Sequence, residues 1–196
     1  MTLAAILMPL LALCVVARGI GFLPLLGLVA AAAMLVDGHT PLQQAGAAMA
    51  AVFAIGPVLF LLRYQHDAAR ERTGSAIPFF ALGLMVLLLL ACTRAGVAVF
   101  PASLCVVVAG LVSVICQHSM VWQWAGLLTC VEGVLLCGVQ AHQPSVVGVA
   151  GLAGAVVAML GGMCIHRIMP RVVPLRPPSA RKKSSPDSPE KNGDAA

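Results

Sequence analysis

The sequence predicts an all-α polytopic membrane protein, a bundle of about seven transmembrane helices with a disordered C-terminal tail. Of its 196 residues, 60% are hydrophobic and only 10% are charged, whereas a soluble domain carries about 25% charged residues. Apolar runs recur along the chain, and nearly all lysines and arginines fall on one side of them. The net charge of +5 comes mostly from the tail after His166 and the loop around Arg70. It therefore indicates orientation and contact with membrane lipid, not nucleic-acid binding.

Seven apolar segments qualify as membrane spans or come close. A hydrocarbon core of about 30 Å needs roughly 20 apolar residues per helix, with a range of about 17–25. The segments, in order, are residues 2–17, 20–36, 43–63, 77–93, 99–117, 119–140 and 145–166. The first has neither a basic start nor an Ala-x-Ala cleavage pattern, so we expect a retained helix and not a signal peptide.

Short polar, glycine- or proline-containing breaks separate these segments. They are, in order, Arg18-Gly19, residues 37–41, 63–78 and 93–101, His118, and residues 141–144. After the last span, the chain is rich in proline, serine and charge, and it cannot bury enough apolar surface to offset its ordering entropy. We therefore expect a transmembrane domain at residues 1–168 and a disordered, basic cytoplasmic tail at residues 169–196.

The distribution of basic residues predicts the orientation. With seven spans, eleven of the lysines and arginines lie on the same side as the C-terminus, and only Arg94 lies on the other. Basic residues are enriched in cytoplasmic segments of membrane proteins. We therefore expect a multi-pass protein of the cell inner membrane, with its N-terminus outside and its C-terminus in the cytoplasm.

Two segments carry small residues at four-residue spacing, which is typical of helix-packing faces. In lipid, helix association gains little from hydrophobicity, so close backbone approach at small residues takes its place. The faces consist of Gly46, Ala50 and Ala54 in the third segment and Ala150, Gly154, Ala158 and Gly162 in the seventh. Whether they meet helices of this chain or of another subunit stays open.

Glu132 is the only acidic residue well inside a predicted span. A charge at mid-bilayer costs roughly 2.5–3.5 kcal/mol on insertion scales, so this glutamate is protonated, paired or next to water. One turn away, its helix offers a single hydroxyl, that of Thr129, and no cation. Three interpretations stay open: a hydrogen-bonded clamp between helices, a part in proton movement, and a contact with a transported substrate.

The remaining polar residues do not indicate a catalytic or metal site. The seven cysteines are scattered through apolar segments without a CxxC pair, which is typical of small core residues. Four histidines lie at predicted helix ends and one lies in the long loop, where interfacial roles are expected. No nucleotide loop or HExxH helix is present. We expect no metal ion, no cofactor and no enzymatic activity of the chain on its own.

The stretch "ICQHSMVWQWAGLLTCVEGVLLC" resembles the membrane subunit called hydrogenase-4 component E. The resemblance rests on Gln123, Gly126, Glu132 and Gly133 and extends more weakly over residues 1–168. The last three helices are similar to the K subunit of respiratory complex I. This sequence departs from the family in two ways: valine precedes and glycine follows Glu132 where the family reads Glu-Asn-Gly, and no lysine lies in the third segment.

The resemblance implies a non-catalytic membrane subunit of a hydrogenase-like or complex-I-like respiratory complex that contributes to proton translocation. Glu132 would act in a proton relay with Gln123 and Thr129 as supporting polar groups, and Gly126 would belong to a packing face. Partners would be antiporter-like membrane subunits and a hydrogenase module that holds all cofactors. The alternatives are a small independent transporter and a structural or assembly protein.

Overall fold

The computed structural model describes residues 3–18, 20–36, 40–61, 76–95 and 101–168, and the described chain is helical with no strand. The helices are α1 Leu3–Arg18, the 3₁₀ turn η1 Ile20–Phe22, α2 Leu23–Val36, α3 Pro41–Leu61, α4 Ala76–Arg94, α5 Ala102–Cys116, α6 Met120–Gln140 and α7 Pro144–Ile168. The prediction of an all-α chain is confirmed for these residues. The predicted disordered tail lies outside the described residues, as does most of the long loop.

Prolines at the starts of helices explain several of these boundaries. Pro41 and Pro144 are the first residues of α3 and α7, where a missing backbone N–H removes no helical hydrogen bond. Thr40 and Gln43 form a reciprocal cap before α3: the Thr40 N–H donates to Gln43 Oε1 at 3.0 Å, and the Gln43 N–H donates to Thr40 Oγ1 at 3.4 Å. This cap begins α3 two residues before the predicted start.

Four helices, α3, α4, α6 and α7, are long and apolar enough to cross a membrane. The other three are apolar but shorter, with 16, 14 and 15 residues in α1, α2 and α5. At 1.5 Å per residue they span about 21–24 Å, less than the roughly 30 Å of a hydrocarbon core. The seven predicted segments are therefore all helices, and four of them have full membrane-spanning length.

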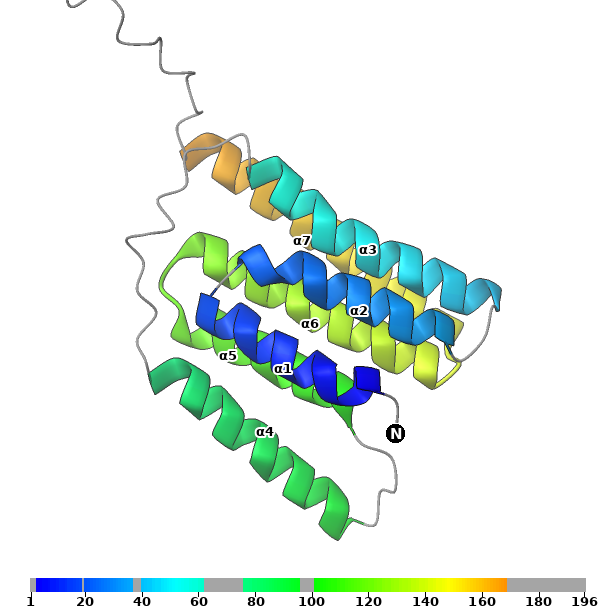
Figure 1. Ribbon diagram of the computed structural model, residues 1–196. Helices are drawn as coiled ribbons and strands as arrows, with labels where there is room; N and C mark the ends of the chain where they lie inside the picture. The colour runs from blue at the N-terminus through cyan, green and yellow to red at the C-terminus, as the bar shows by residue number, and fades with distance from the viewer. Residues whose placement is uncertain (1–2, 19, 37–39, 62–75, 96–100, 169–196) are drawn as a thin grey trace, which may run out of the picture.

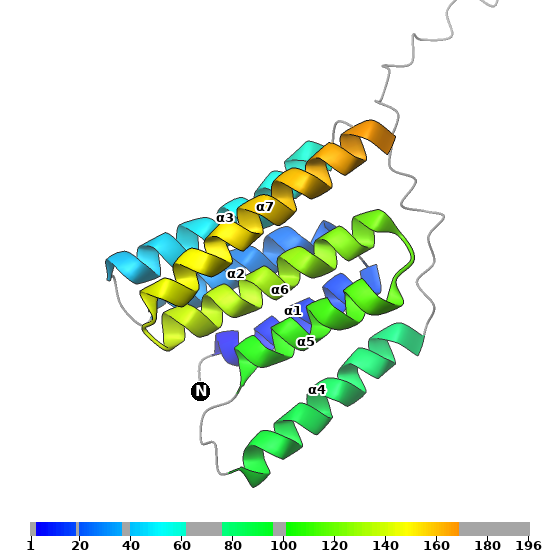
Figure 2. The same cartoon turned by 180° about the vertical axis from the view of Figure 1, so that it is seen from behind.

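The helices form two facing layers, with α4 at one edge. One layer contains α1, α2 and α3, and the other contains α5, α6 and α7; α1 packs on α5, α2 on α6 and α3 on α7. Successive helices run in opposite directions (Figure 1). Arg18 and Arg167 therefore lie at one end of the bundle and Arg94 lies at the other. The view from behind shows α4 beside α5, away from α3 and α7 (Figure 2).

Helix α6 occupies the centre of the bundle. It packs against α1, α2, α3, α5 and α7, and it is the most buried of the four membrane-length helices, whereas α4 is the least buried. The order of hydropathy among these four helices is the reverse of the order of burial, with α4 the most apolar and α6 the least. The central helix can carry polar groups on the faces that its neighbours cover, because protein and not lipid contacts the side chains there.

Glycines bring α5 and α6 into backbone contact. A Cβ atom on Gly110 would lie 2.7 Å from the carbonyl oxygen of Gly126, and one on Gly126 would lie 2.9 Å from the carbonyl oxygen of Gly110. Two turns further along this contact, a Cβ on Gly133 would lie 3.0 Å from the carbonyl oxygen of Ser103. Because backbone atoms cannot swing aside as side chains do, these three glycines fix the separation of the two helices.

We expect Gly126→Val to destabilise the bundle by about 1–3 kcal/mol, the typical cost of overpacking a close contact. The control is Gly148→Val on α7, where an added Cβ meets nothing within 4 Å. The measurement is the free energy of unfolding in mixed detergent micelles titrated with a denaturing detergent. Equal stability of the two variants would contradict the backbone contact.

Candidate functional site

The candidate site is the carboxyl group of Glu132, near the middle of α6. The residue is 0% exposed, and within the described part of the chain neither Oε1 nor Oε2 has a hydrogen-bond partner. It is also the only acidic residue among the described ranges. Burying an ionised carboxylate without a partner costs several kcal/mol. A charge on Glu132 therefore requires water or a partner group to reach it.

The carboxyl group lies where α6 meets α2 and α3. A Cβ atom on Gly27 of α2 would lie 3.0 Å from Glu132 Oε1 and 3.0 Å from the carbonyl oxygen of Ala50, and it would collide with the Cβ of Ala54. The missing side chain at Gly27 therefore makes the space that the carboxyl group and α3 share. Ala50 and Ala54, predicted as part of a packing face, form the opposite wall.

Gly27 was not among the predicted packing or site residues, because its segment, residues 20–36, was predicted only as a membrane span. The available signal was small residues at Gly27 and Ala31, four positions apart, both of which are buried. That spacing predicts close approach of a neighbouring helix. It does not indicate that the neighbouring helix brings a carboxyl group with it.

The two supporting polar residues form their hydrogen bonds elsewhere. The Thr129 hydroxyl donates to the carbonyl oxygen of Ala125 at 2.9 Å, one turn back in the same helix. The Gln123 side-chain amide donates to the carbonyl oxygen of Gln117 at 2.8 Å, which ties the start of α6 to the end of α5. Neither bond involves Glu132, so the carboxyl group is isolated from both.

The small-residue face of α3 meets helices of this chain. A Cβ atom on Gly46 would lie 2.5 Å from Val139 Cγ2 of α6 and 3.2 Å from Met34 Sδ of α2. Together with the contact of Ala50 and Ala54 at Gly27, this places the whole predicted face of α3 against α2 and α6. The contacts of this face are therefore intramolecular.

The small-residue face of α7 divides into two halves. Ala150 is buried, and a Cβ on Gly154 would lie 2.6 Å from Phe53 Cε2 and 2.8 Å from Val131 Cγ1, so this half packs against α3 and α6. Ala158 and Gly162 instead line a cavity. A Cβ on Gly162 would come no closer than 3.9 Å to the Phe60 ring.

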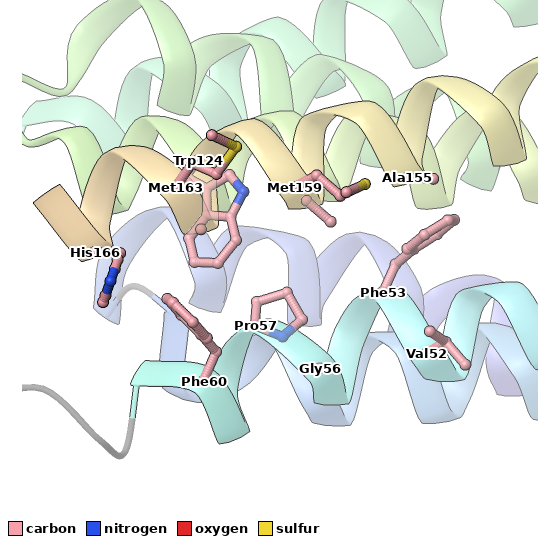
Figure 3. A pocket seen from close by; sticks show the side chains of 12 residues that line it. Val52, Phe53, Gly56, Pro57, Phe60, Trp124, Ala155, Met159, Met163 and His166 are labelled. Carbon is pink, nitrogen blue, oxygen red and sulfur yellow. The ribbon is translucent and has the colours of Figure 1, made fainter.

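This cavity, of about 770 Å³, lies between α3 and α7. Its walls are mostly apolar, with Phe53, Pro57 and Phe60 on one side, Met159 and Met163 on the other, and His166 at one end (Figure 3). Trp124 forms part of the wall, and its indole N–H donates to the carbonyl oxygen of Val157 at 3.0 Å.

Cysteines and histidines do not form a metal-binding cluster in the described ranges. All seven cysteines are free, and the Cys130 thiol lies 3.5 Å from the carbonyl oxygen of Val107 in the contact with α5. His142, at the end of α6, has a φ of 53°, and its Nδ1 lies 3.1 Å from the carbonyl oxygen of Val139.

Across the described ranges, fold and site together define a class: an all-helical bundle of apolar, membrane-type helices with an unpartnered carboxyl group in its core. No protein-family model matches the chain, and neither a curated protein nor a solved structure matches it.

We expect Gly154→Leu to destabilise the protein and Gly162→Leu to leave its stability unchanged, although both add a leucine side chain to the same face of α7. Leucine at Gly154 meets Phe53 and Val131 and should lower the free energy of unfolding by about 1–3 kcal/mol. Leucine at Gly162 projects into the cavity, so the free energy of unfolding should stay within about 0.5 kcal/mol of that of the parent protein. Detergent unfolding of both variants checks this, and equal losses would contradict the division of the face.

Proposed function

We propose that the chain is a non-catalytic integral membrane subunit in which Glu132 takes part in proton translocation. The observation that carries this proposal is the complete burial of a carboxyl group at the meeting of α2, α3 and α6, where no described residue forms a hydrogen bond with it. Ionisable residues inside membrane helices are rare, and they most often mark ion pathways or proton relays. A carboxyl group is suited to this role because it binds and releases one proton.

The assembly follows from the resemblance to hydrogenase-4 component E. Under this hypothesis, the chain joins antiporter-like membrane subunits of a hydrogenase-like or complex-I-like respiratory complex. Nickel-iron and iron–sulfur centres belong to the partners. Gln123 then holds the start of α6 against α5, and Thr129 lies one turn from Glu132 with its hydroxyl bonded to the helix backbone.

A purely structural role for Glu132 is the competing interpretation. A clamp between helices works through hydrogen bonds, and an unmade bond at a buried polar group is destabilising by about 1–3 kcal/mol. Within the described residues neither carboxyl oxygen makes such a bond. This isolation favours a group that exchanges a proton over one that holds two helices together.

The proposed orientation places the end with Arg18 and Arg167 in the cytoplasm and the end with Arg94 outside. The alternating helix directions support it, since they separate these arginines in the way that the positive-inside rule requires. We expect a reporter that is active only outside the cytoplasm to be silent when fused after Lys183 and active when inserted after Arg94. The reverse pattern would contradict the orientation.

We expect Glu132→Gln to insert and assemble normally, because glutamine keeps the shape of the side chain and loses only the titratable proton. Proton transfer by a positioned side chain typically contributes a factor of about 100 or more, so pumping should fall by at least about tenfold. The measurement is proton uptake by membrane vesicles, normalised to the amount of assembled complex.

Glu132→Ala separates the two interpretations. If Glu132 is a clamp, glutamine should serve almost as well as glutamate, and alanine should lose assembly. If Glu132 relays protons, both variants should lose pumping while the glutamine variant stays assembled. Full pumping by a correctly assembled Glu132→Gln protein would end the relay proposal.

A further inference from the structure

A second, smaller cavity opens on the same three helices that surround Glu132. It has a volume of about 250 Å³ and lies between the end of α2, the start of α3 and the end of α6, at the end of the bundle where Arg94 lies. Its lining includes Met34, Gln43, Leu136, Gln140 and His142. A cavity of this size with several polar lining groups has room for several water molecules.

The floor of this cavity is one helical turn from Glu132. Leu136 lines the cavity and follows Glu132 by four residues, so their backbones are separated by about 6 Å along α6. Leu136 and Met34 are each 2% exposed and close the floor. The walls between the floor and Glu132 are small, with Gly27 and Ala31 on α2 and Ala50 on α3.

The route in the opposite direction is closed by apolar packing. One turn towards the other end, Leu128 is 0% exposed, and Ala125 and Val121 beyond it are 1% and 2% exposed. The larger cavity between α3 and α7 approaches α6 at Trp124, which is eight residues or about 12 Å from Glu132 along the helix. Of these two cavities, the smaller one at the Arg94 end therefore lies nearer to Glu132 along α6.

Few ionisable groups lie along this route. Neither α2 nor α3 contains an ionisable side chain. Among the described residues, the route therefore has Glu132 at its inner end and His142 at the cavity mouth. Within the described part of the chain, a proton that crosses the intervening turn has no other carboxyl or imidazole group to bind.

We infer that the cavity is a hydrated vestibule through which protons reach Glu132 from the Arg94 end of the bundle, with Leu136 as an apolar gate. Movement of the Leu136 side chain joins the vestibule to the carboxyl group, because the facing walls on α2 and α3 are glycine and alanine. The use of this access in pumping rests on the function proposed above. The one-sided access itself does not.

A membrane-impermeant carbodiimide with an amine nucleophile tests the access directly, because it converts a reachable carboxyl group into an amide. The full-length protein is placed in sealed liposomes, and the reagent is added outside or inside. Peptide mass spectrometry then measures amide formation at Glu132. Asp37, in the segment joining α2 to α3, and Glu71, in the segment joining α3 to α4, report which side the reagent reached.

The matched variants are Leu136→Ala and Leu128→Ala, which remove the same atoms from two fully packed positions one turn on either side of Glu132. We expect Leu136→Ala to raise Glu132 modification at least fivefold over the parent, when the reagent is on the side that modifies Asp37. Leu128→Ala should leave the modification of Glu132 within twofold of the parent level. Because the two variants remove equal volume, a general loosening of the fold would raise the modification of Glu132 in both of them.

Three results would overturn the vestibule: modification of Glu132 from the Glu71 side, an equal rise in both variants, or no modification in Leu136→Ala from the Asp37 side. The relay proposal is judged separately by pumping in Glu132→Gln. One-sided modification together with normal pumping keeps the vestibule and ends the relay. Loss of pumping in Glu132→Gln, together with modification of Glu132 from the Glu71 side, keeps the relay and ends the vestibule.

Discussion

Close contact between helix backbones at glycine and alanine determines how this bundle assembles. Lipid chains are as apolar as leucine, so membrane helices associate through packing and not through escape from water. Here Gly110 and Gly126 bring α5 against α6, and Gly27 brings α2 against α3 and α6. These contacts cover several faces of α6 with neighbouring helices. The burial of Glu132 follows from this packing, because a looser bundle would leave its carboxyl group facing lipid or water.

Helix positions could be predicted well from the sequence, because hydropathy is a local property. Each of the seven apolar segments is a helix, and the segment predicted at 119–140 is observed at Met120–Gln140. The differences arise at helix ends, where specific local bonds decide. The Thr40–Gln43 cap lets α3 begin two residues earlier than predicted. Pro101 precedes α5, which begins three residues later than predicted.

The candidate site could be predicted only in part. Glu132 is apparent from the sequence because a carboxylate is conspicuous in an apolar segment. Its surroundings are not, because they depend on which faces of distant helices meet. Gly27 and Glu132 are more than one hundred positions apart in the chain, yet an added Cβ at Gly27 would touch the carboxyl oxygen. Thr129 is close to Glu132 in sequence and still bonds to its own helix backbone.

The inverse relation between hydropathy and burial bears on how the chain enters the membrane. The segment α4 is the most apolar of the membrane-length helices and packs least, so its own transfer into lipid is favourable without help from neighbours. The segment α6 is the least apolar and contains Glu132. The helices that pack on it are α1, α2, α3, α5 and α7, and all of them except α7 precede it in the chain. A chain synthesised from its N-terminus therefore contains most of the helices that bury this polar segment before the segment itself is made.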